Sequence, residues 1–129
     1  MANRAQDRLA QANRDLEQAQ ASLAEQRHEW ACFAAHQAAE KAVKALHLSQ
    51  GQEAFGHVVA RLLRDLPPAL QADEALLDKA KVLDNFYIPA RYPDAHPEGA
   101  PFEHYGSLQS EEALKHARAI LNFANAELA

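Results

Sequence analysis

The sequence predicts an all-α protein of five helices, with a long proline-rich loop between the last two. Three observations support this fold class. Hydrophobic residues make up 48% of the 129 residues, and many are alanine, which favours helix, whereas β-branched residues are scarce. Apolar side chains recur at helical spacing over long stretches. Four of the six prolines lie between residues 88 and 106. The length fits a single domain spanning residues 1–129.

The first two predicted helices, residues 3–25 and 27–48, differ in how much of their surface is apolar. The first carries one stripe, formed by Ala5, Leu9, Ala12, Leu16, Ala19 and Leu23. In the second, small apolar side chains cover about half of the circumference. A surface of that width contacts at least two neighbours, so we expect 27–48 to be the central helix. Trp30 and Phe33 lie on its polar side, where they either cover a groove or meet another subunit.

A short third helix is predicted from about Phe55 to Leu66. Gly51 suits the end of the preceding helix, and the prolines at 67 and 68 stop the third one. Its predicted apolar stripe consists of Val58, Val59, Leu62, Leu63 and Leu66.

The fourth and fifth predicted helices flank the proline-rich loop. The fourth begins near Asp73 and Glu74, whose carboxylates favour a helix amino terminus, and packs through side chains up to Tyr87. The fifth is introduced by Ser107 or Ser110 and carries a stripe of Leu114, Ala117, Leu121, Ala124 and Leu128.

Residues 88–106 are expected to form an ordered loop that presents Arg91, Asp94 and His96. Proline fixes its own φ and restricts the residue before it, so this stretch cannot continue the fourth helix. Long loops without structure of their own are uncommon in compact domains and are more often functional or disordered. The aromatic residues of this stretch argue against disorder. The loop is therefore the first candidate for a functional site.

Charge and cysteine content narrow the function and the location. The net charge is −5 with histidine neutral, and no basic cluster is present, so a high-affinity, non-specific binder of duplex nucleic acid is not expected. Cys32 is the only cysteine, so no internal disulfide can form and a reducing cytoplasm fits best. No run approaches the roughly 18 apolar residues of a membrane span. We expect a cytoplasmic protein without a membrane contact.

Three segments together resemble the HEPN domain, a nucleotide-binding domain of higher eukaryotes and prokaryotes. They are the run WACFAAHQAAEKAVKAL at 30–46, the pair Gly56 and His57, and the segment YIPARYPD at 87–94. The resemblance covers essentially the whole chain and implies an up-and-down helical bundle that forms a homodimer. In prokaryotes such domains are often encoded beside a minimal nucleotidyltransferase, as a toxin–antitoxin pair. The Arg-Tyr-Pro-Asp form is similar to that of small stand-alone prokaryotic members.

The resemblance also implies candidate site residues. Many members are metal-independent endoribonucleases whose signature is an arginine followed four to six residues later by a histidine, and Arg91 and His96 match that spacing as catalytic residues. An arginine fork holds phosphate through two parallel hydrogen bonds, and a histidine moves a proton to or from the ribose 2′-hydroxyl or the leaving oxygen. No metal ion or other cofactor is expected. The nucleotide or phosphate contacts expected are Arg91, Tyr92, Asp94, Lys41, Lys44 and His57.

Plainer alternatives exist for these residues. Arg91 and Asp94 can form an ion pair that pins the loop, and His96 can be a solvated loop residue. His57 can bond locally at a helix start. The lysines can belong to a solvated helix face. A metal site is conceivable, but the spacings match no compact ligand motif among His96, Glu98, Glu103 and His104.

The function has an alternative as well. The first expectation is a domain that binds a nucleotide or RNA, as a metal-independent endoribonuclease toxin or as the partner of a minimal nucleotidyltransferase. The alternative is a non-catalytic helical adaptor. Its aromatic and loop surface would then dock a protein partner.

Overall fold

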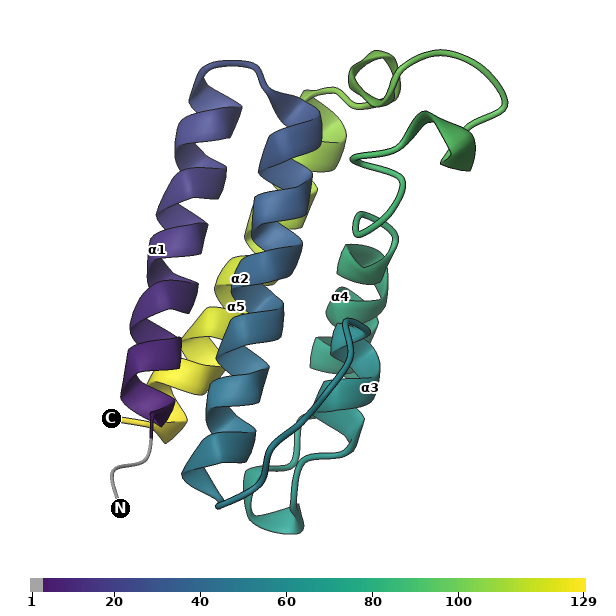
Figure 1. Ribbon diagram of the computed structural model, residues 1–129. Coiled ribbons are helices and arrows are strands. Elements are labelled where there is room, and N and C mark those ends of the chain that lie inside the picture. The colour runs from purple at the N-terminus through teal and green to yellow at the C-terminus, as the bar shows by residue number, and fades with distance from the viewer. Residues whose placement is uncertain (1–3) are drawn as a thin grey trace.

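The computed structural model describes residues 4–129, and this part of the chain folds into five α-helices without a strand (Figure 1). The helices are α1 (Ala5–Ala24), α2 (His28–Ser49), α3 (Val59–Arg64), α4 (Glu74–Asp84) and α5 (Ser107–Glu127). Three short 3-10 helices lie in the connections, η1 (Pro68–Leu70), η2 (Pro93–Ala95) and η3 (Pro101–His104). The all-α, five-helix prediction is confirmed. The predicted start of the first helix, residue 3, lies outside the described residues.

The central position of α2 is confirmed. It packs against α1, α3, α4 and α5, and α1 and α2 run antiparallel side by side (Figure 1). Small residues make this possible because they let neighbouring helices approach closely; those without any exposure are Ala31, Ala35, Ala38, Ala39, Ala42 and Ala45. Larger fully buried side chains fill the space between the helices, among them Leu46, Leu63, Leu83, Ile120 and Leu121.

The predicted start of the third helix at Phe55 is wrong. Gly56 has φ +100°, a left-handed conformation that an α-helix does not contain, and Val58 is extended, so α3 begins at Val59. Val58 was expected in the buried stripe but is 53% exposed. A helix of six residues is marginal on its own. Its amino terminus is capped from another helix, because Asp84 of α4 accepts hydrogen bonds from the backbone nitrogens of Val59 (2.7 Å) and Ala60 (3.1 Å).

The ends of the other helices follow the sequence more closely. Gly51 has φ +75° just beyond α2, as its position predicts. The Asp73 side chain caps α4 by accepting a hydrogen bond from Leu76 N at 2.8 Å. Tyr87 lies beyond the end of α4, in the loop.

The proline-rich loop 88–106 carries η2 and η3 and is tied to itself and to the bundle. Ala90 is buried, His96 Nε2 donates to the carbonyl of Pro89 at 2.7 Å, and Tyr105 packs edge-on against Phe86. The loop joins the upper ends of α4 and α5 in Figure 1, at the same end of the bundle as the short turn between α1 and α2.

No helix within residues 4–129 combines the length and the apolar content that a membrane crossing needs.

Candidate functional site

Arg91 is held by aromatic rings in the described structure. Its guanidinium carbon lies 4.4 Å from the centre of the Phe33 ring, 4.6 Å from that of Tyr87 and 5.0 Å from that of Tyr92. Its Nε donates a hydrogen bond to the carbonyl of Tyr87 at 2.9 Å. No ion pair or hydrogen bond among residues 4–129 engages its two terminal nitrogens. The side chain is thus fixed in place while both terminal nitrogens stay available for an anion.

The ring of Tyr87 connects Arg91 to His57. The His57 ring stacks on Tyr87, with ring centres 4.6 Å apart and an interplanar angle of 16°. His36 and Phe33 of α2 also contact the Tyr87 ring, at 5.1 and 6.1 Å between centres. Residues from α2, from the segment before α3 and from the segment after α4 therefore meet at one ring.

His57 is oriented by a buried carboxylate. Its Nδ1 lies 2.9 Å from Oε1 of Glu40, whose other oxygen accepts a hydrogen bond from Lys44 Nζ at 3.2 Å. Glu40 is 5% exposed, whereas the His57 side chain is 53% exposed. Because a carboxylate accepts, Nδ1 carries a proton, and in the neutral ring the lone pair is on Nε2.

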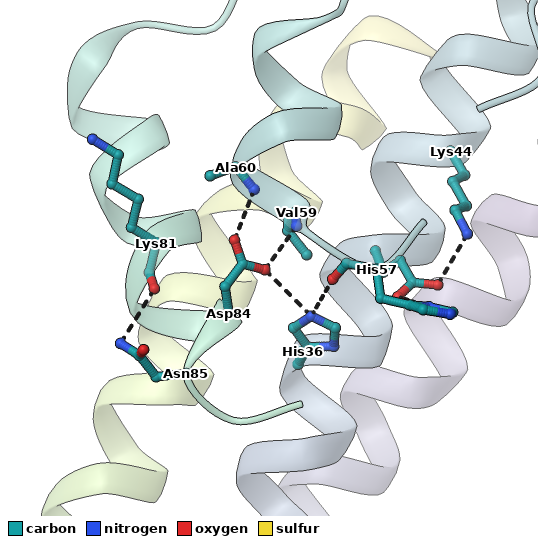
Figure 2. A network of polar contacts seen from close by, with 9 residues as sticks. His36, Lys44, His57, Val59, Ala60, Lys81, Asp84 and Asn85 are labelled. Carbon is teal, nitrogen blue, oxygen red and sulfur yellow. Dashed lines mark hydrogen bonds and ion pairs between the residues drawn. The ribbon is translucent and has the colours of Figure 1, made fainter. Parts of the chain in front are cut away.

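A second polar network fixes the backbone of His57 (Figure 2). The Nε2 proton of the fully buried His36 points to the His57 carbonyl at 2.9 Å and to Asp84 Oδ1 at 3.4 Å. Asp84 also caps α3, so one carboxylate joins α2, α3 and α4. His36 Nδ1 is buried without a partner. The segment that carries His57 is thereby anchored on both sides.

His96 has a different environment in the described structure. Its Nε2 is engaged by the Pro89 carbonyl, and its ring stacks on His104 with centres 4.1 Å apart. His104 Nε2 in turn donates to the Glu98 carbonyl at 2.6 Å. No hydrogen bond, ion pair or ring contact joins His96 to Arg91 among residues 4–129. The fold of one chain therefore brings Arg91 and His57 to the same Tyr87 ring, and the role of His96 stays a prediction.

Of the remaining predicted contact residues, two lie at the site and two do not. Tyr92 lies beside Arg91 and is 49% exposed, and Lys44 reaches the site through Glu40. Lys41 points to the other side of α2 and pairs with Asp15 of α1. Asp94 is exposed, and within the described residues it makes no ion pair with Arg91, so the alternative of a pinning pair is wrong.

Among residues 4–129 no group of three or more histidine, cysteine, aspartate or glutamate side chains is placed to hold a metal ion. The set His96, Glu98, Glu103 and His104 does not form such a group.

Cys32 is not a nucleophile in the folded chain. It is fully buried on α2, and burial, followed by the nearby Glu29 carboxylate, raises the pKa of its thiol to about 12. Burial also raises the pKa of Tyr105, with Cys32 as the second cause. The thiol is therefore protonated and shielded at neutral pH.

Glu40 was not singled out from the sequence, yet it is buried and hydrogen-bonded to His57. The signal lies in the spacing of Phe33, His36, Glu40 and Lys44, which follow one another at three, four and four residues and so share one face of α2. That face carries an aromatic side chain followed by three ionisable ones, a pattern that suits a site better than a solvated surface.

Two hollows border the site. One, of about 720 Å³, lies beside His57 and is lined in part by Phe55, Gly56 and Arg61. The other, of about 580 Å³, lies between α1 and α2 and is lined in part by Trp30 and Phe33. Each hollow shares one side chain with the site, His57 in the first and Phe33 in the second.

Comparison with solved structures identifies close relatives of the fold. The TT1696 protein of Thermus thermophilus is 53% identical, with a TM-score of 0.95 over 97% of this chain and 98% of that one. An archaeal HEPN homologue, ST0689, is 40% identical with a TM-score of 0.81 over the full length of both chains. A HEPN domain protein of Thermotoga maritima, tm0613, is 34% identical with a TM-score of 0.75 over 95% and 97%.

Comparison of sequences agrees with this result. A Methanocaldococcus jannaschii protein described as putative toxin MJ1304 is 27% identical over 88% of this chain and 80% of its own length. The HEPN domain family matches residues 5–127, which is nearly the whole chain. Together with the five-helix architecture and the segments around Arg91 and His57, these matches show that the chain belongs to the HEPN family.

Proposed function

We propose that this protein binds the phosphate of a nucleotide or RNA at Arg91 and cleaves RNA without a metal ion. The observation that carries the proposal is the guanidinium itself, which is fixed by three aromatic rings and one backbone bond while its terminal nitrogens stay unengaged in the described structure. A planar fork held in this way loses little freedom when it binds a phosphate through two parallel hydrogen bonds.

The surroundings of Arg91 suit a nucleotide better than an isolated phosphate. Tyr92 is half exposed beside the guanidinium, and an exposed aromatic ring stacks on an unpaired base, at about 1–3 kcal/mol per base. The net charge of −5 makes long-range attraction of duplex nucleic acid weak. Short or single-stranded nucleic acids are therefore the ligands expected, since they need few phosphate contacts and offer unpaired bases for stacking.

The chemistry requires a phosphate clamp and a group that moves a proton. Arg91 supplies the clamp, and the spacing of the motif assigns the proton to His96. A metal ion is unnecessary when both roles are filled by side chains. The relative described as a putative toxin supports a toxin role for this chain. A nucleotidyltransferase partner and a cytoplasmic location are further parts of the proposal.

A homodimer belongs to the same proposal. Trp30 is 51% exposed at the edge of the hollow between α1 and α2, next to Phe33, and a large exposed aromatic side chain is typical of an interface. Light scattering at micromolar concentration should give twice the mass of one chain. A monomer mass would contradict the dimer without affecting the Arg91 site.

The second candidate, a helical adaptor, rests on the same exposed aromatic surface. Trp30, Tyr92 and Phe102 are exposed apolar side chains at the loop end of the bundle, and such side chains also anchor protein partners. The two candidates differ in their need for Arg91 as a phosphate ligand.

The experiment incubates the purified chain with a mixed RNA substrate, with and without EDTA, beside the Arg91→Ala and Arg118→Ala variants. Arg118 is an exposed arginine of α5 and serves as the matched control for loss of one charge. We expect EDTA-resistant cleavage in the wild type and in Arg118→Ala, and none in Arg91→Ala. A requirement for a divalent ion, or cleavage that persists in Arg91→Ala, contradicts the proposal. Absence of both cleavage and nucleotide binding leaves the adaptor.

A further inference from the structure

We propose that His57, positioned by Glu40, is the residue that takes the proton from the ribose 2′-hydroxyl of a single-stranded RNA whose phosphate is held by Arg91. The inference rests on the metal-independent cleavage at Arg91 in the proposed function. It assigns the proton acceptor to His57 in place of His96, and it adds a positioning carboxylate and a substrate class. Neither His57 nor Glu40 belongs to the arginine–histidine motif that the sequence singles out.

The seven histidines differ in what their two ring nitrogens contact. In His36, His47, His96 and His104, Nε2 is engaged by a backbone carbonyl. In His116, Nε2 is engaged by Glu112 and Nδ1 is buried without a partner. His28 contacts Ser110 through Nδ1 and has no carboxylate partner in residues 4–129. Only His57, among these, combines a buried carboxylate on Nδ1 with an exposed ring whose Nε2 has no partner in the described structure.

This combination is what a base needs. The carboxylate of Glu40 accepts from Nδ1–H, which places the lone pair on Nε2 and stabilises the imidazolium that forms when Nε2 takes a proton. Glu40 is nearly fully buried, so little solvent competes for it, and Lys44 engages its second oxygen. Stacking on Tyr87 fixes the plane of the ring. Glu40 touches no substrate in this arrangement and acts by positioning His57.

Arg91 and His57 contact the same ring, that of Tyr87. The guanidinium carbon of Arg91 and the ring centre of His57 each lie 4.6 Å from the centre of the Tyr87 ring. The two contacts place the guanidinium carbon and the imidazole centre no more than about 9 Å apart. A phosphate bound at Arg91 together with its adjacent ribose can span that separation.

The hollow beside His57 indicates what kind of RNA fits. It has a volume of about 720 Å³, and Phe55 at its edge is 81% exposed. Phe55 beside this hollow and Tyr92 beside Arg91 are exposed aromatic rings on which unpaired bases can stack. Bases in a duplex are already stacked and do not present those faces. The substrate class is therefore single-stranded RNA.

The proposed step is a transesterification in which atoms and charges balance. The 2′-hydroxyl proton moves to Nε2 of His57, and the 2′-oxygen forms a bond to phosphorus. The bond from phosphorus to the 5′-oxygen breaks, and its electron pair stays on that oxygen, which takes a proton from water. The hydroxide formed then removes the proton from His57. The products are a 2′,3′-cyclic phosphate and a 5′-hydroxyl, with no net oxidation or reduction.

The activity test uses a single-stranded RNA in EDTA and measures cleavage by His57→Asn, Glu40→Gln, His96→Asn and Arg91→Ala. We expect His57→Asn to lose about 100-fold or more, and Glu40→Gln about tenfold. Added imidazole should restore part of the activity of His57→Ala, which a merely structural histidine would not show. Matched controls are His116→Asn and Glu112→Gln. These two residues form a histidine–glutamate pair on α5, and both variants should keep wild-type activity. A substrate with a 2′-deoxyribose at the cleaved position should be inert.

A second measurement covers variants that lose stability. Nitrogen NMR of the imidazole rings should show the Nδ1–H tautomer for His57 in the wild type, and loss of that preference in Glu40→Gln. Uridine 3′-monophosphate should shift the His57 and Arg91 signals saturably, and the shift should vanish in Arg91→Ala.

The outcomes separate this inference from the proposed function. Cleavage that needs Arg91 but survives in His57→Asn overturns the inference and leaves the proposed function, as does a loss confined to His96→Asn. Nucleotide-induced shifts at Arg91 without any at His57 overturn it too. Shifts at both without cleavage overturn the proton-transfer step and leave binding. Absence of both cleavage and shifts overturns the inference together with the proposed function.

Discussion

Two histidines lie on either side of Arg91 in the sequence, and the fold treats them differently. His57 is bonded to a buried carboxylate, stacks on the ring that also contacts Arg91, and exposes a nitrogen without a partner in the described structure. His96 is five positions from Arg91, yet its Nε2 is engaged by a loop carbonyl and its ring by His104. Nearness in sequence and nearness in the site are therefore separate properties.

The difference shows what each contact does for a histidine. A backbone carbonyl holds the ring in place and occupies the nitrogen it meets, which suits a loop that must keep its shape. A buried carboxylate holds the ring through one nitrogen and makes the other a better proton acceptor. The contacts of His96 thus hold the loop in shape, whereas those of His57 fit the role of proton acceptor that we propose for it.

Replacement of Arg91 by lysine should have the largest effect. Lysine keeps the charge but cannot lie flat among three rings or offer two parallel donors, so we expect RNA cleavage to fall about 100-fold. Kinetics of cleavage in EDTA measure the loss. Wild-type kinetics in Arg91→Lys would show that a positive charge is sufficient at this position. The planar, ring-held guanidinium would then have no part in the difference between His57 and His96.

Asp84→Ala should destabilise the segment that carries His57, because Asp84 caps α3 and contacts His36. Asp84 accepts two backbone hydrogen bonds at the start of α3 and lies next to His36, so its loss should cost about 2–3 kcal/mol in the free energy of unfolding. Asp73→Ala, which removes one local cap of α4, is the control and should cost about 1 kcal/mol. Urea unfolding gives both values. Equal losses would mean that the inter-helix cap has no special importance.

Tyr87→Leu should weaken nucleotide binding, because Arg91 and His57 both contact the Tyr87 ring. The variant removes the ring that both contact, and we expect the affinity for uridine 3′-monophosphate to fall about tenfold. Tyr105→Leu removes a ring on the His96 side and is the matched control, with unchanged affinity expected. Titration calorimetry measures both. A larger loss in Tyr105→Leu would move the binding site to the loop.

The thiol of Cys32 should show the smallest effect, because neither side of the site uses it. Burial raises its pKa from 9.0 to about 12, so below that pH the folded chain keeps the thiol protonated, whereas the unfolded chain ionises from about pH 9 upward. A maleimide should therefore not label the native protein at pH 8, and should label it rapidly in urea. Labelling of the native protein would show that α2 opens locally.

Much of the fold follows from local patterns in the sequence. The apolar periodicity and the alanine content predict α1, the central α2 and α5, and Gly51 and Asp73 mark helix ends where the structure has them. The start of α3 was misplaced because its apolar spacing continues back through Val58, whereas Gly56 takes a left-handed φ and the cap comes from Asp84. A cap supplied from another helix leaves no local signal.

The sequence by itself determined the helical class, the family and the prominence of Arg91, because periodicity, proline positions and short motifs are local properties. Only the tertiary structure decided which side chains surround Arg91. The burial of Glu40 and the placing of His57 on Tyr87 depend on the segment before α3 lying across α2, anchored there by His36 and Asp84. Such contacts join residues far apart in the chain, and no spacing rule encodes them, since they exist only once the helices have packed.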